Sequence, residues 1–149
     1  MRALTLLTLV VLLGAAGPQE GSHYFLGTWS CAGVRWAFEP LQPGSSWMHI
    51  TYGDPKRPAG IAVMGFVLGM HVWLYRDFHA DGSYADLTSA GPKNSRWEWG
   101  GPYYPASGGA ALHGRITYVE VSPKRYDRIF EAQKGNTLVK MGGDTCSKQ

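Results

Sequence analysis

The two cysteines place the strongest constraint on the fold, because they lie near the two ends of the chain. Cys31 ends the alternating stretch 25–31, whose pattern is typical of a β-strand, and Cys146 lies close to residue 149. Two cysteines in an oxidising compartment most simply form one disulfide. The sequence therefore predicts that Cys31 pairs with Cys146. Such a pair would make the first and last strands neighbours and close the sheet between them.

The N-terminal residues have the parts of a secretory signal peptide. Arg2 supplies a positive charge, residues 3–13 form an apolar run, and the small residues 14–16 follow. The run is shorter than the roughly 20 residues that a membrane span needs, although a short anchor helix is the alternative. We expect a signal peptide over 1–16, cleaved after Ala16, so that the mature chain is secreted or periplasmic and not stably inserted in a membrane.

Residues 17–149 suit one domain with a substantial core. The full chain has 14 Lys and Arg against 11 Asp and Glu, a formal net charge of +3. Its basic residues are scattered, whereas a nucleic-acid surface would gather them on one patch. The charge pattern therefore predicts no nucleic-acid partner, and the sequence does not identify a protein partner.

Short alternating stretches rich in β-branched and aromatic residues recur along the chain, and they are separated by glycine, proline and Asp-Gly turns. The 20 glycines and nine prolines fit many turns. This pattern predicts an all-β domain, a closed or nearly closed antiparallel up-and-down barrel of eight or nine strands. The expected strands are 24–38, 46–52, 59–69, 71–78, 84–89, 96–100, 110–121, 126–132 and one beginning at 137 that leads towards Cys146.

The first strand carries Gly27-Thr28-Trp29, which resembles the Gly-x-Trp signature of lipocalins and their calycin relatives. The layout of the mature chain is similar to that of small exported bacterial barrels of this lipocalin-like kind. The resemblance implies structural roles for Gly27 and Trp29. It also implies an arginine packed on the tryptophan. Because the expected last strand carries Lys140 and no arginine, Arg128 or Arg115 is expected to take that place.

An eight-stranded barrel has room inside for one small ligand or for packed side chains. The chain has six Trp, eight Tyr and five Phe that could line such a cavity or simply fill the core. The main functional hypothesis is non-catalytic binding of a small hydrophobic or amphipathic molecule. The residues whose strand parity makes them candidates for the cavity are Trp47, His71, Trp73, Tyr75, Trp97, Trp99 and His113, together with His49.

Three alternatives remain open. The resemblance also covers barrels that hold haem through a histidine of a late strand, where His113 or else His71 would be the ligand; otherwise no cofactor is expected. A protein-binding module could use the loops 40–46 and 101–109. No catalytic motif is present, so we predict no enzyme, although a general base could be drawn from a polar strand face. That set consists of His71, Tyr75, Asp77 and Asp86.

Overall fold

The computed structural model of the protein describes residues 22–149. The predicted signal peptide, residues 1–16, lies outside the described residues. Within residues 22–149, two 3₁₀ turns and ten strands follow one another. In order they are η1 (Ser22–Tyr24), β1 (Gly27–Cys31), β2 (Val34–Pro40), β3 (Met48–Asp54), β4 (Arg57–Val67), η2 (Leu68–Met70), β5 (Val72–His79), β6 (Tyr84–Ser89), β7 (Arg96–Tyr104), β8 (Leu112–Ser122), β9 (Arg125–Lys134) and β10 (Thr137–Lys148).

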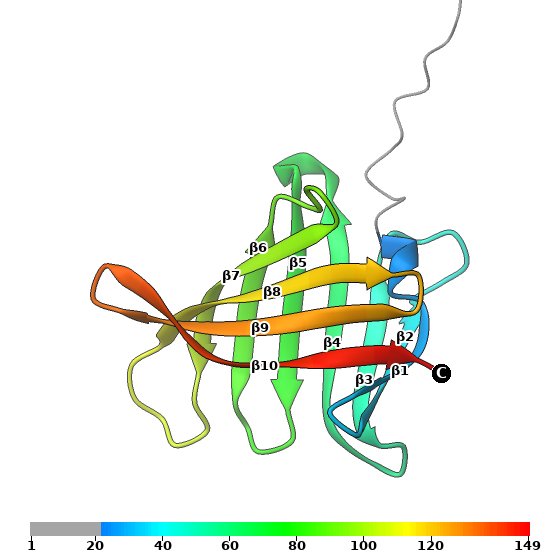
Figure 1. Cartoon of the computed structure of the whole chain (residues 1–149). Helices are drawn as coiled ribbons and strands as arrows, with labels where there is room; N and C mark the ends of the chain where they lie inside the picture. Colours follow the sequence, from blue (N-terminus) through cyan, green and yellow to red (C-terminus); the bar gives the residue numbers. More distant parts are fainter. Residues whose placement is uncertain (1–21) are drawn as a thin grey trace, which may run out of the picture.

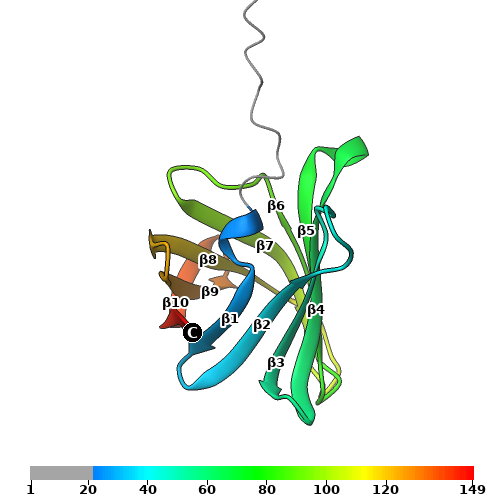
Figure 2. The same ribbon diagram turned by 90° about the vertical axis from the view of Figure 1, so that its right-hand side faces the viewer.

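The strands form one closed barrel in which each strand is antiparallel to its neighbours in the sequence and β1 pairs with β10 (Figures 1 and 2). The predicted all-β, antiparallel up-and-down barrel is therefore confirmed. It has ten strands, where the sequence pattern predicts eight or nine. Closure pairs both edges of every strand, which removes the exposed sheet edges that promote aggregation.

The additional strand comes from the segment 24–38, which the alternating pattern predicts as a single strand. The structure divides this segment into β1 and β2, joined by a tight turn at Ala32 and Gly33. Both residues have positive φ, 49° and 81°, as the right-handed twist of a two-residue hairpin requires. Glycine adopts this conformation readily and alanine rarely does, so the turn is hard to recognise from the sequence.

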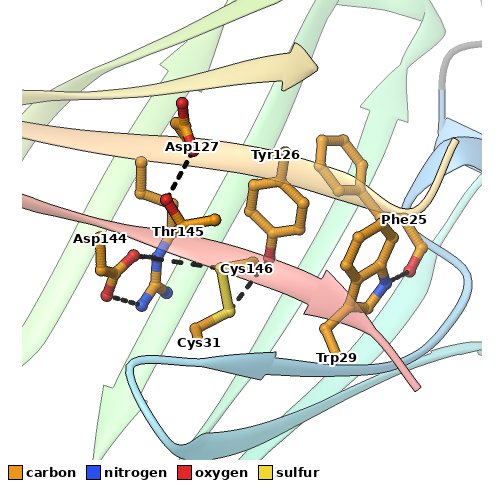
Figure 3. Close-up of a disulfide and its surroundings, with 9 residues drawn as sticks. Phe25, Trp29, Cys31, Tyr126, Asp127, Asp144, Thr145 and Cys146 are labelled. Atoms are coloured by element: carbon orange, nitrogen blue, oxygen red, sulfur yellow. Dashed lines mark hydrogen bonds and ion pairs between the residues drawn. A yellow bond between two sulfur atoms is a disulfide. The ribbon is translucent and has the colours of Figure 1, made fainter. Parts of the chain in front are cut away.

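An even number of strands makes β1 and β10 antiparallel, and this orientation brings the cysteines together. Cys31 lies directly opposite Cys146 in the β1–β10 register, with their Cα atoms 4.1 Å apart. The predicted disulfide is confirmed (Figure 3). Both cysteines are buried, and the hydroxyl of Tyr126 lies 3.6 Å from Cys31 Sγ. The bond thus fixes the seam where the sheet meets itself.

One part of the barrel is packed solidly with aromatic rings. Phe25 follows η1 and is fully buried, and its ring contacts Phe38, Trp97, Tyr118 and Tyr126. The hydroxyl of Tyr24 reaches the backbone oxygens of Ser122 and Arg125 at 2.7 and 2.6 Å, so η1 is attached to the β8–β9 turn. Figure 1 shows η1 beside that turn. The segment 22–26 and the rings packed around Phe25 therefore close this end of the barrel, and we call them the aromatic plug.

Trp29 lies next to this plug, and its indole N–H donates to the Phe25 backbone oxygen at 2.7 Å (Figure 3). The cation on Trp29 is Lys148 of β10, whose Nζ lies 5.2 Å from the ring centroid. We expected Arg128 or Arg115 in this place. Lys148 was not considered, because the predicted last strand leads only towards Cys146, whereas β10 continues to Lys148. Gly27 has φ of 108° and lies against the Lys148 side chain, a position that favours glycine.

We predict that replacing both cysteines by alanine lowers the free energy of unfolding by about 4 kcal/mol. The cross-linked residues are 115 apart, so in the chain-entropy model the bond removes much freedom from the unfolded chain. Urea unfolding of C31A/C146A against the oxidised wild type measures the difference. Wild-type protein unfolded with a reductant is the control. A loss below about 1 kcal/mol would contradict the view that this bond holds the barrel closed.

Candidate functional site

Beyond the aromatic plug the barrel interior is hollow. The cavity has a volume of about 300 Å³ and is lined by residues of β2, β3 and the strands from β5 to β9. Two aliphatic residues, Ala85 and Ile116, face it, and three polar side chains do so as well: Asp77, His79 and Arg128. The remaining lining is aromatic and consists of Trp36, Tyr52, Tyr75, Tyr103, Tyr118 and Phe130. An apolar wall with a few convergent polar groups is the usual character of a small-molecule site.

A second hollow of about 210 Å³ adjoins this cavity. The two share Ala85, Tyr103, Ile116 and Phe130 as lining residues. The outer hollow is also bounded by the exposed side chains of Leu112 and His113 on β8. The shared walls indicate one binding space with an inner part beside Asp77 and an outer part near β8, where Arg115 and Glu131 form an ion pair in the lining.

Four side chains form a hydrogen-bonded group in the inner part. The hydroxyl of Tyr52 donates to Asp77 Oδ1 at 2.8 Å, and the hydroxyl of Tyr75 donates to Asp77 Oδ2 at 3.1 Å. His79 lies on the same face of β5, with Nε2 at 3.5 Å from Asp77 Oδ2 and Nδ1 at 2.9 Å from the Tyr52 oxygen. Because Tyr52 gives its hydrogen to Asp77, its oxygen is free to accept one from Nδ1 of His79.

Gly60 makes room for Tyr52 in this group. The two residues are directly opposite in the β3–β4 register, and a Cβ at position 60 would collide with the Tyr52 hydroxyl and with the Phe78 backbone oxygen. The phenol ring lies over the bare backbone of β4, an arrangement known for glycines in sheets. Glycine at this position therefore allows the Tyr52 hydroxyl to reach Asp77 and His79.

Arg128 faces the cavity from β9 but is already paired. Its Nε and Nη2 donate to the two oxygens of Asp144 at 2.7 and 2.6 Å, a bidentate ion pair. Its guanidinium carbon lies 4.5 Å from the centroid of the Trp36 ring. The ring of Tyr52 also stacks on Trp36, with the two ring centroids 4.2 Å apart. The Trp36 indole nitrogen is buried and has no hydrogen-bond partner among the described residues.

Burial dominates the electrostatics of the site. Burial raises the pKa of Asp77 above its ordinary value, although the hydrogen bond from Tyr52 and the proximity of His79 act in the opposite direction. Burial likewise raises the pKa of Tyr118 to about 12, and it also raises the pKa values of Tyr52 and Tyr75 above their ordinary value. These tyrosines stay protonated at neutral pH and act as hydrogen-bond donors.

The structure divides the predicted ligand-binding residues into three groups. Tyr75 lines the cavity. Trp73, Trp97 and Trp99 point inward but are packed in the core, where Trp97 and Trp99 stack with centroids 5.5 Å apart. The others lie outside the inner cavity: Trp47 covers Gly65 on the outer face, His49 is on the outer side of β3, His71 is exposed in the turn after η2, and His113 borders the outer hollow.

The polar face proposed as a general-base set is only partly assembled. Tyr75 and Asp77 are in contact inside the barrel. Asp86 instead lies on the outer face, where its carboxylate is 3.3 Å from Arg76. The histidine that joins Asp77 is His79 and not His71. The alternation of β5 already indicates this, because residue 79 follows 75 and 77 with the same parity. Tyr52 and Trp36 could be recognised only from the pairing of β2, β3 and β4.

Other hollows and clusters are weaker candidates. A surface hollow of about 420 Å³ is bounded by polar or small residues of the β6–β7 loop and β7, including Lys93, Asn94 and Glu98. It lies outside the barrel and has none of the apolar walls of the inner cavity. Within residues 22–149, no three His, Cys, Asp or Glu side chains converge as a metal site requires. The same residues include no helix long and apolar enough to cross a membrane.

Comparison of the sequence with protein-family models and with curated proteins finds no match.

We predict that Tyr52→Phe raises the pKa of Asp77 further, by about one pH unit. The hydroxyl of Tyr52 stabilises the ionised carboxylate, and a hydrogen bond to a charged group contributes about 1.5 kcal/mol or more. Carbon-13 NMR titration of the Asp77 carboxyl measures the change. The control is Tyr84→Phe, because the Tyr84 hydroxyl bonds to Arg76 and does not contact Asp77. An unchanged or lower pKa in Y52F would contradict the hydrogen-bond assignment.

Proposed function

We propose that the protein is an exported lipocalin-like barrel that binds a small hydrophobic or amphipathic molecule without transforming it. The observation that carries this proposal is the interior cavity of about 300 Å³, which combines aromatic walls with a buried polar group. A barrel whose interior served only stability would be filled by side chains, as this one is around Phe25. The interior beside Asp77 is instead unfilled.

The lipocalin-like part of the proposal is supported by the closed antiparallel barrel and by the position of Gly27 and Trp29 on its first strand. A lysine of β10 covers the tryptophan where the lipocalin pattern has an arginine, so the arrangement is retained with a different cation. Export is supported by the signal-like N-terminus and by the disulfide, which persists in oxidising compartments.

The shape of the space defines the ligand. The inner and outer hollows share walls and together suit a molecule with an apolar body and one polar end. The apolar body would lie against Ile116, Tyr103 and Phe130, where the two hollows meet. The polar end would lie beside Tyr52, Asp77 and His79.

We predict that Ile116→Trp weakens binding of the neutral fluorescent probe N-phenyl-1-naphthylamine at least about tenfold. The larger side chain fills the place where the two hollows meet, and a ligand excluded from an apolar pocket loses that burial. Fluorescence titration measures the dissociation constant.

The matched control is Ile61→Trp, which adds the same indole at an exposed position on the outer face of β4. Thermal unfolding verifies that both variants fold. Equal probe affinity in I116W and I61W, or no saturable binding to the wild type, would overturn the proposed cavity function.

A further inference from the structure

The charged side chains around the cavity differ in their partners. Among the described residues, Arg128 and Asp144 form a bidentate ion pair and neutralise each other. Asp77 is also buried, only 6% exposed, and its ion-pair neighbour is His79, which is a cation only when protonated. Asp77 therefore has no permanently charged cation as a partner among the described residues, because the neighbouring arginine is held by Asp144.

The surroundings of Asp77 select what can compensate its charge. Its two oxygens accept hydrogen bonds from Tyr52 and Tyr75, which hold the carboxylate in place without neutralising it. The cavity is otherwise lined mainly by aromatic side chains, among them Tyr103, Tyr118 and Phe130. Aromatic faces attract cations through their quadrupole, and Arg128 already lies over Trp36 and Phe130 in this way. A cation on the ligand would meet both an anion and aromatic faces.

We propose that the ligand is a small amine whose ammonium group pairs with Asp77 and whose apolar body lies between the aromatic walls. This inference rests on the proposed binding function of the cavity. An anionic ligand is disfavoured because both arginines that line the binding space are already paired, Arg128 with Asp144 and Arg115 with Glu131. A buried carboxylate without a cation is destabilising, and an ammonium group would supply the missing partner.

Three indoles of nearly equal size test the proposal at neutral pH: tryptamine is a cation, tryptophol is neutral and indole-3-propionate is an anion. We expect tryptamine to displace N-phenyl-1-naphthylamine from the full chain with at least about tenfold higher affinity than either analogue, because a charge-assisted hydrogen bond is stronger than a neutral one. Equal affinities, or a preference for tryptophol or indole-3-propionate, would overturn the amine assignment while leaving the cavity function intact. If the fluorescent probe itself does not bind, the proposed function fails first and the amine assignment with it.

A matched pair of variants locates the preference. Asp77→Asn removes the charge inside the barrel and keeps an acceptor oxygen, whereas Asp86→Asn removes the same charge on the outer face beside Arg76. We expect D77N to lose the preference for tryptamine over tryptophol and D86N to retain it. Near-ultraviolet circular dichroism verifies folding. If D77N does not fold, the comparison of the three indoles on the wild type still decides the proposal. A folded D77N that keeps the preference would contradict the role of Asp77.

Discussion

Closure of the sheet is the constraint on which the other features of the protein depend. The pairing of β1 with β10 turns a linear series of hairpins into a barrel, and the Cys31–Cys146 disulfide lies in that seam. Only a closed sheet has an interior surrounded on all sides, so the aromatic plug and the cavity both follow from this one contact. The β1–β2 turn contributes by making the number of strands even, which orients the two end strands correctly.

The interior is used in two different ways. Around Phe25 it is filled with rings that bury apolar surface and stabilise the barrel. Beside Asp77 it is hollow and polar, and this arrangement costs stability because a carboxylate is held in a poorly hydrated place. Proteins commonly accept such a local cost at functional sites. The contrast between the two parts is the main reason to propose that the second binds a ligand.

The sequence predicts the fold well and the site poorly. The alternation of side chains within each strand is a local pattern, and two cysteines can form only one intramolecular pair. The barrel and its disulfide can therefore be predicted from the sequence. The cavity is formed by residues from different strands, and its lining depends on register and on which end is plugged. Trp73, Trp97 and Trp99 have inward parity like Tyr75, yet they fill the core because Phe25 packs at their end of the barrel. The inward direction of His79 could be deduced from its parity on the strand. The position of the Tyr52 hydroxyl could not, because it depends on the space that Gly60 leaves on the neighbouring strand.

The seam has a topological consequence. Because β1 and β10 are joined by the disulfide and pair like two consecutive strands, the ten strands between residues 27 and 148 form a ring in which each strand pairs with the one before it and the one after it. The chain could therefore begin at another strand of this ring and form the same pairs. A short linker across the seam would permit new termini at an exposed turn such as 81–82, between β5 and β6, in a circular permutant with the same barrel. The order of the strands in the gene would then be one of several that encode a single architecture.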